Sequence, residues 1–366
     1  MQSQRVTPGD LGARAHALPH ASAASMTVLA RLRATTLSLE APDPLAGEAL
    51  EQAKLRLAGV RGGPADEPRG GAAADTARGE HDAAWVALAC LATGQAELVA
   101  DLLRSLSRRR DTDAACAARG EPPARFAESS TAPYPLLAAA YAAWTADLAA
   151  LGGEAFDDGV HEPTALLPDA GSPPDPLLAS ARESLAAYAA GRSEAAFGHW
   201  WRCVQRLVAD GAQPREDAHA DRITAGSPPE VAAANIVVPL VYGLLGVEPD
   251  ALRHRLRLRL QPPAAWDRLH VERLRVGDAE VSLRYCREGA RHTLCVEQTR
   301  GAVPLRLVLE PLLPARRLAN ARVDGRDARL DARPAGERLL VPIQLVLDHE
   351  RSLEVYVEYD PDDDAV

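Results

Sequence analysis

The spacing of the hydrophobic residues changes near residue 250. Before this point they recur at helical spacing in stretches rich in alanine and leucine. After it they alternate with polar residues, as in Leu256, Leu258 and Leu260, which are separated by arginines. Alternation puts successive side chains on opposite faces of a strand. The pattern therefore predicts a multidomain chain, with a helical domain over residues 45–250 and an antiparallel β-sandwich over residues 251–359.

The helical domain is predicted to consist of hairpins. Gly94 suits the end of one helix, and Gly191 separates two others. Both pairs are expected to form antiparallel hairpins. The predicted helices are 46–58, 81–93, 96–109, 131–151, 175–190, 193–208 and 230–245. Residues 1–44, rich in proline and small residues, are predicted to form a loose arm, in which 27–39 could be one strand or a short helix.

The second domain is predicted to be all β. Its turns include Gly277-Asp278 and Asp324-Gly325, which favour tight hairpins. The predicted strands are 253–260, 268–276, 279–287, 291–298, 303–312, 320–323, 328–331, 338–347 and 352–359. The apolar positions expected to face one core are Leu256, Leu258, Leu260, Val281, Leu283, Leu305, Leu307, Val355 and Val357. Residues 360–366 form an acidic tail in this interpretation.

The boundary between the two domains is predicted between Val247 and Arg253. Gly246 and Pro249 favour the end of a helix, and the alternating strand pattern begins directly after them.

Charge and composition limit the possible partners. The chain has 41 basic and 51 acidic residues, and its formal net charge is -10. Binding to phosphates needs a clustered positive surface, so nucleic acid is excluded as the main partner. No run of about 18 apolar residues lacks a polar break, which argues against a membrane span. We expect a cytoplasmic protein without a cofactor.

The five cysteines are scattered and none has metal-ligand spacing, so no metal site is expected. Cys286 and Cys295 could face each other across a hairpin, but two half-buried thiols are the favoured interpretation.

Several stretches carry a resemblance to a known family. They are Leu-Leu-Gly-Val-Glu-Pro-Asp at 244–250, Leu-Arg-Leu-Arg-Leu at 256–260, Pro-Pro-Ala-Ala-Trp-Asp at 262–267, and the segments 81–94 and 132–147. Residues 45–358 thus resemble the C-terminal half of six-hairpin (α/α toroid) glycosidases. In particular, the chain is similar to bacterial proteins related to the glucosidase part of glycogen-debranching enzymes.

The resemblance implies a partial toroid followed by the sandwich. A complete toroid contains more helices than residues 45–246 supply, so an incomplete ring would leave exposed apolar helix edges. Either a partner chain or self-association completes the ring, or the chain is a decayed copy.

The resemblance also implies a site with paired carboxylates. Such enzymes hold an acid and a base roughly 6.5 to 9.5 Å apart when they invert configuration. Glu216 is the candidate general base, and Glu128 is the second catalytic candidate. Asp82 is expected to bind sugar hydroxyls, and Glu121, in the same predicted loop as Glu128, is a second candidate for substrate binding.

Aromatic faces are the other expected part of a sugar site. Trp85 and Trp200 are the candidates for substrate contact. Trp200 adjoins Trp201 on one predicted helix, so at most one of the two rings can face the core fully. Packing in the core or at an interface is the favoured interpretation for Trp200 and Trp201.

Two functions follow from the resemblance. The first is a glycoside hydrolase, inverting and α-glucosidase-like, that acts on an α-glucan or a related oligosaccharide. The second is a catalytically inactive carbohydrate-binding or assembly protein that retains the fold. Ser130 favours the second, because it stands where the family commonly has an aspartate. In the alternative, Asp82 caps its helix, and Glu121 and Glu128 are solvated loop acids.

Overall fold

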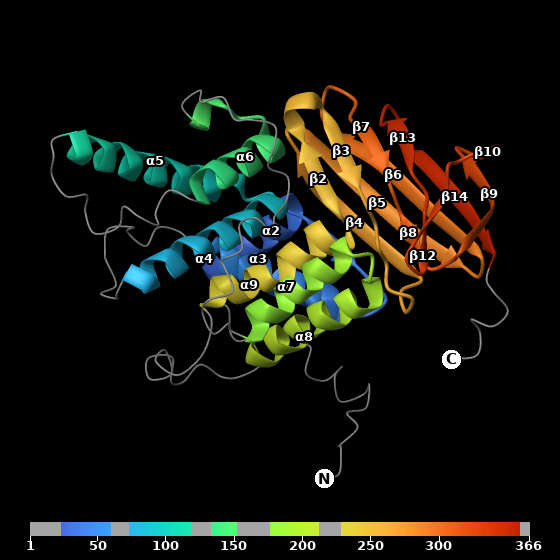
Figure 1. Ribbon diagram of the computed structural model, residues 1–366, viewed down its shortest axis with the longest axis horizontal. Coiled ribbons are helices and arrows are strands. Elements are labelled where there is room, and N and C mark those ends of the chain that lie inside the picture. The colour runs from blue at the N-terminus through green and yellow to red at the C-terminus, as the bar shows by residue number, and fades with distance from the viewer. Residues whose placement is uncertain (1–22, 60–72, 119–132, 152–175, 212–227, 359–366) are drawn as a thin grey trace, which may run out of the picture.

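The computed structural model describes residues 23–59, 73–118, 133–151, 176–211 and 228–358. Helices form the N-terminal part and sheets the C-terminal part (Figure 1). The helices are α2 (Ala23–Thr35), α3 (Pro44–Ala58), α4 (Ala73–Ala92), α5 (Ala96–Ala118), α6 (Pro133–Thr145), α7 (Pro176–Ala189), α8 (Ser193–Gly211) and α9 (Pro229–Val238). α9 continues into the π-helical turn η4 (Pro239–Leu244), and two short 3-10 turns are η1 (Ala149–Leu151) and η5 (Ala251–Arg253).

Helix α9 lies at the centre of the helical part. It packs against α3, α4, α7 and α8. From Val231 to Val238 its side chains are apolar apart from Asn235, and all of these residues are buried except Ala232. A helix that is hydrophobic all round belongs in a core. The described helices therefore cluster around a central helix, and the predicted toroid is not confirmed.

Local signals set the helix ends. Asp43 caps α3, because its side chain accepts a hydrogen bond from the Leu45 amide, and Pro44 occupies the first turn. Gly94 follows α4 with φ of 83°, and Gly191 follows α7 with φ of 72°. Glycine adopts this left-handed conformation without steric cost. Short turns therefore join α4 to α5 and α7 to α8, as predicted.

The strands are β1 (Ser38–Glu40), β2 (Val247–Asp250), β3 (Arg255–Leu258), β4 (Arg268–Val276), β5 (Ala279–Glu288), β6 (Arg291–Arg300), β7 (Arg306–Leu309), β8 (Leu312–Leu313), β9 (Arg317–Val323), β10 (Arg326–Asp327), β11 (Arg333–Ala335), β12 (Arg338–Leu340), β13 (Ile343–Val346) and β14 (Arg351–Glu358). They form a 7-stranded sheet in the order β1-β4-β5-β6-β14-β9-β10, a 4-stranded sheet in the order β13-β7-β3-β2 and a 3-stranded sheet in the order β11-β12-β8. Strand pairs are antiparallel, apart from the parallel pair β3–β7.

The predicted apolar positions of the sheets are confirmed. Leu256, Leu258, Leu260, Val281, Leu283, Leu305, Leu307, Val355 and Val357 are all buried. The turn at Asp324 and Gly325 has φ of 51° and 73°, which fits a tight hairpin between β9 and β10. The predicted strand at 328–331 is wrong, since residues 328–332 form no strand and the next strand, β11, begins at Arg333.

The ends of the helical part differ from the prediction. Residues 23–40 belong to the folded body: α2 is followed by β1, and β1 pairs with β4 at the edge of the 7-stranded sheet. At the other end the helix stops at Leu244, and β2 already pairs with β3. Pro249 fits β2 because this strand lies at a sheet edge, where an unpaired backbone position is tolerated. The change from helix to strand therefore lies next to Val247.

The helical and β parts share one hydrophobic core. In the turn after α4, the Thr93 carbonyl accepts a hydrogen bond from the Leu37 amide. The next residue, Gly94, lies against Arg275 of β4. The turn after α7 lies against Leu312. The opposite helix ends point away from the sheets (Figure 1). We call them the distal end: the first residues of α4, α6, α7 and α9, and the last residues of α3, α5 and α8.

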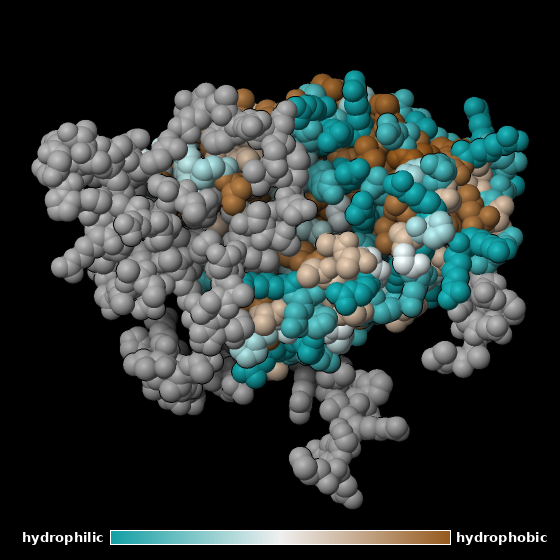
Figure 2. All heavy atoms as spheres, in the orientation of Figure 1, coloured by the Kyte–Doolittle hydropathy of each residue, from teal (hydrophilic) through white to brown (hydrophobic). Residues whose placement is uncertain are grey.

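Hydrophilic and hydrophobic side chains alternate over the visible face of the sheets (Figure 2). Large apolar side chains with at least 40% exposure come from separate elements: Val28, Leu148, Leu252, Val303 and Val346. Exposed hydrophobic residues scattered in this way are ordinary for a folded protein.

Candidate functional site

Two opposite charges, Asp82 and Arg182, lie within electrostatic reach of each other in the helical part. Asp82 lies in the interior of α4, and its side chain is half-buried. Because α4 begins at Ala73, Asp82 is not the cap of this helix. Arg182 lies on α7 and is also half-buried. Burial lowers the pKa of Arg182, and the negative charge of Asp82 opposes this shift.

Two nitrogens of Arg182 have unused hydrogen-bonding capacity. Nε and Nη2 are shielded from solvent, and neither has a hydrogen-bond partner. The local sequence explains why Arg182 is half-buried. Its neighbours Ala181 and Leu185 on α7 face the core, so Arg182 lies at the border of the buried side of this helix. Both α4 and α7 pack on α9, so the pair lies on helices that share this central neighbour.

Trp85 and Trp200 belong to the core. Trp85 is 1% exposed and donates its indole N–H to Oδ1 of Asn235 at 2.9 Å. Trp200 is 0% exposed and donates to the Ile236 carbonyl at 2.9 Å. Neither ring has a face open to a ligand, so the structure does not support their role in substrate contact. Trp201, next to Trp200, is the half-exposed ring of the two.

Glu121, Glu128 and Glu216 lie outside the described residues, as does Ser130. Their connections are flanked by helix ends that are described. Residues 119–132 join the end of α5 to the start of α6, and residues 212–227 join the end of α8 to the start of α9. All of these helix ends belong to the distal end. The separation between the candidate carboxylates remains a prediction.

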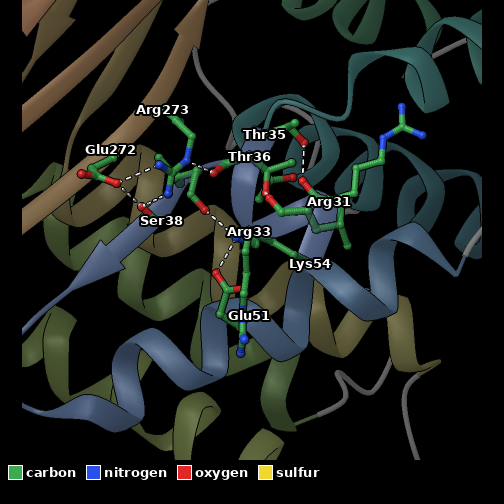
Figure 3. Close-up of polar contacts among 12 residues, drawn as sticks. Arg31, Arg33, Thr35, Thr36, Ser38, Glu51, Lys54, Glu272 and Arg273 are labelled. Carbon is green, nitrogen blue, oxygen red and sulfur yellow. Dashed lines mark hydrogen bonds and ion pairs between the residues drawn. The ribbon is translucent and has the colours of Figure 1, made fainter. Parts of the chain in front are cut away.

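A second polar cluster lies where the N-terminal segment meets the sheet. Lys54 of α3 is 0% exposed, donates to the Leu37 carbonyl at 2.8 Å and pairs with Glu51. Arg273 of β4 donates to the Thr36 carbonyl at 3.0 Å. Figure 3 shows Lys54 and Arg273 approaching the end of α2 from α3 and from the sheet.

The backbone of β4 directs Arg273 into this cluster. Its φ is 59°, at a register shift in the pairing of β4 with β5. Such a bulge redirects a side chain. The cluster fastens α2 and β1 to the body, and we assign it a structural role.

The described residues contain no group of three or more histidine, cysteine, aspartate or glutamate side chains able to hold a metal ion. Within the same residues, no helix has the length and apolar character needed to cross a membrane. Cys286 and Cys295 are free thiols; Cys295 pairs with Arg284 across the hairpin rather than with Cys286.

Sequence reasoning missed Arg182. Its signal was available, because a charged residue stands between the buried positions Ala181 and Ser184 of α7. Lys54, the single lysine of the chain, carries no local signal of its buried role either.

Comparison with known proteins gives no family. No protein-family profile and no curated protein sequence matches the chain. One similar solved structure is a putative kojibiose phosphorylase from the human microbiome, with 12% identity and a TM-score of 0.28 over 46% of this chain and 18% of that one. Another is an α-L-rhamnosidase from Dictyoglumus thermophilum, with 12% identity and a TM-score of 0.30 over 62% of this chain and 32% of that one. The chain thus spans less than a third of either protein, and at these TM-scores neither likeness carries an argument about activity.

Proposed function

We propose that the protein is glycoside hydrolase-like and binds a carbohydrate between α4 and α7. In this proposal Asp82 accepts hydrogen bonds from sugar hydroxyls and Arg182 donates them. One observation carries it: a half-buried carboxylate and a half-buried guanidinium lie near each other, and two guanidinium nitrogens have no hydrogen-bond partner.

The chemistry of the pair suits a sugar. A sugar hydroxyl both donates and accepts hydrogen bonds. An ionised carboxylate only accepts, and a guanidinium only donates. The two groups together can therefore hold adjacent hydroxyls in a fixed orientation. Hydrogen bonds to charged groups are also stronger than neutral ones, so few contacts are needed for recognition.

Hydrolysis would need the second part of the proposal. Glu216 would activate water as the general base, and Glu128 would protonate the leaving oxygen, with the two carboxyl groups roughly 6.5 to 9.5 Å apart. The support is topological: the connections that carry both residues start and finish at the distal end. An α-glucan or a related oligosaccharide is the substrate class that the sequence resemblance implies. A cytoplasmic location is part of this proposal, since the described cysteines are free thiols.

A non-catalytic carbohydrate-binding or assembly protein is the second candidate. Ser130, in place of an expected aspartate, favours it. Binding and hydrolysis of maltose, isomaltose and short glucans by the purified protein distinguish the two functions. Cleavage that is lost in Glu216→Gln and Glu128→Gln would support the hydrolase, whereas binding without cleavage would support the second candidate.

Asp82→Asn tests the site itself. We expect it to weaken sugar binding, because a carboxylate acceptor is replaced by a group that is neutral. Asp101→Asn is the matched control: Asp101 lies on α5 and its side chain is 69% exposed. If no sugar binds, or if both variants bind as the wild type does, the site between α4 and α7 should be abandoned.

A further inference from the structure

The guanidinium of Arg182 leaves one complete edge unsatisfied. Nε and Nη2 lie on the same side of the planar group, and their N–H bonds point in nearly the same direction. Both atoms are shielded from solvent without a hydrogen-bond partner. Two parallel donors in a fixed plane fit an acceptor that has two oxygens at matching spacing.

Other arginines of the described residues do not share this feature. In Arg259, Arg291 and Arg351, Nε is the one solvent-shielded nitrogen without a partner. Each of them binds a carboxylate through an Nη atom: Arg259 holds Glu310, Arg291 holds Glu354, and Arg351 holds Asp324.

The most buried arginine of the sheets, Arg338, binds Glu194 at 2.6 Å and also donates to two backbone carbonyls. The fold thus supplies acceptors to its other shielded guanidinium groups. The exception at Arg182 points to an acceptor from outside the protein.

An anion fits this edge better than a hydroxyl. Burial removes water from the guanidinium, and Asp82 offsets its positive charge through space without satisfying Nε or Nη2. A hydroxyl offers one oxygen, whereas a carboxylate or a phosphate offers two. Hydrogen bonds from the guanidinium are charge-assisted with either acceptor, but only the oxyanion can accept from Nε and Nη2 together in bidentate fashion. A shielded cation also requires a counter-charge more than an exposed one does.

We propose that the ligand carries an oxyanion group, a carboxylate or a phosphate, which binds the Nε–Nη2 edge of Arg182 in bidentate fashion. The proposal rests on the proposed function for the sugar part of the ligand. It narrows the ligand to acidic sugars, such as a uronic acid or a sugar phosphate. Asp82 then holds hydroxyls of the same ligand.

The test compares charged and neutral probes. Binding of glucuronic acid, glucose 6-phosphate and glucose would be measured by calorimetry on the wild type, Arg182→Lys and Arg182→Met. Arg182→Lys keeps the positive charge and removes the two parallel donors of the Nε–Nη2 edge. Arg182→Met removes both the charge and the donors. Arg192→Met is the matched control, because Arg192 is exposed in the turn after α7.

We expect at least one acidic sugar to bind the wild type about tenfold or more tightly than glucose does, as is usual for bidentate recognition of an anion. Both Arg182 variants should lose this preference, and Arg192→Met should keep it. Tighter binding of glucuronic acid would identify the oxyanion as a carboxylate, and tighter binding of glucose 6-phosphate would identify it as a phosphate. If Arg182→Met does not fold, Arg182→Lys carries the comparison.

Two results would overturn the inference. If glucose binds as tightly as the acidic sugars, the proposal of carbohydrate binding stands and the proposal that the ligand carries an oxyanion is wrong. If the acidic sugars bind but Arg182→Lys and Arg182→Met keep their affinity, the site of the anion is wrong.

Failure of the proposed function looks different, because then no sugar binds at all. In that case inorganic phosphate and acetate test whether the Nε–Nη2 edge of Arg182 binds an oxyanion that carries no sugar. Thermal stabilisation of the wild type by either anion, absent in Arg182→Met, would support an oxyanion site without a sugar. The lack of any stabilisation would refute the inference as well.

Discussion

Replacement of Lys54 tests whether the N-terminal segment is held by a buried cation. The Lys54 side chain is fully buried, and its ammonium binds the Leu37 carbonyl and Glu51. Lys54→Ala removes both contacts and leaves a cavity. Breaking a buried ion pair by deleting one partner costs about 3–5 kcal/mol, and we expect a loss of this size in the free energy of unfolding.

Lys54→Met separates charge from packing. Methionine fills a similar volume, so the main loss is the unsatisfied Leu37 carbonyl, which costs about 1–3 kcal/mol. Glu51 keeps a partner, since Arg33 also pairs with it at 3.3 Å. Arg33→Met is the control. Because the Arg33 side chain is 57% exposed, its contribution should be about 0–1 kcal/mol.

The pH dependence gives a second measurement. Burial lowers the pKa of Lys54 from 10.5, against the opposing effect of Glu51. Between the lowered pKa and 10.5 the unfolded state binds more protons than the folded state. Stability from this residue therefore rises with pH in that range. The difference in stability between wild type and Lys54→Met should grow in the alkaline range.

Urea unfolding followed by circular dichroism measures both effects. The reasoning would be refuted if Lys54→Ala unfolded within about 0.5 kcal/mol of the wild type, the range of ordinary surface substitutions.

Substitutions at His292, Leu307 and Gly243 test the sheets and the packing of η4. Burial lowers the pKa of His292 to about 4, so the protein should lose about 3 kcal/mol of stability as pH falls from 6.5 to 4, and His292→Gln should lose less. Leu307→Ala should cost about 2–5 kcal/mol, and Leu307→Asp should abolish soluble expression; a normal yield would show that this face is exposed. In Gly243→Ala the new Cβ would clash with Tyr188 and cost about 1–3 kcal/mol, whereas Gly198→Ala has free space and should not destabilise. Equal melting temperatures for the two alanine variants would contradict the packing of η4 on α7.

The sheets were predictable because their pattern is local. Strict alternation marks which side of a strand is buried, and glycine marks the turns. The strand pattern therefore placed Leu256 and Val355 correctly on the core side, far apart in the chain. The pairing of β1 with β4 was not predictable, because a strand of only three residues carries too little pattern and its partner lies more than 200 residues away.

The candidate site was predictable only in part. Asp82 was recognised from the resemblance, but its neighbour Arg182 comes from another helix, and no local pattern links the two. The roles of Trp85 and Trp200 could not be read from the sequence, because a tryptophan with a buried N–H partner gives the same sequence signal as one that faces a ligand. Asn235 and the Ile236 carbonyl supply those partners, and both become visible only when α9 is placed.

The two ends of the helical part differ in a way that favours the distal end for binding. At the sheet side the helices are joined by short turns that pack on β-strands, and hydrogen bonds such as Ser193 to Gln261 fix them there. At the distal end the helices are joined by long connections. Long connections on a rigid scaffold are where binding residues concentrate. The sheets therefore serve as the base that fixes α4, α7 and α9, and the proposed ligand of Asp82 and Arg182 would lie on α4 and α7 above this base.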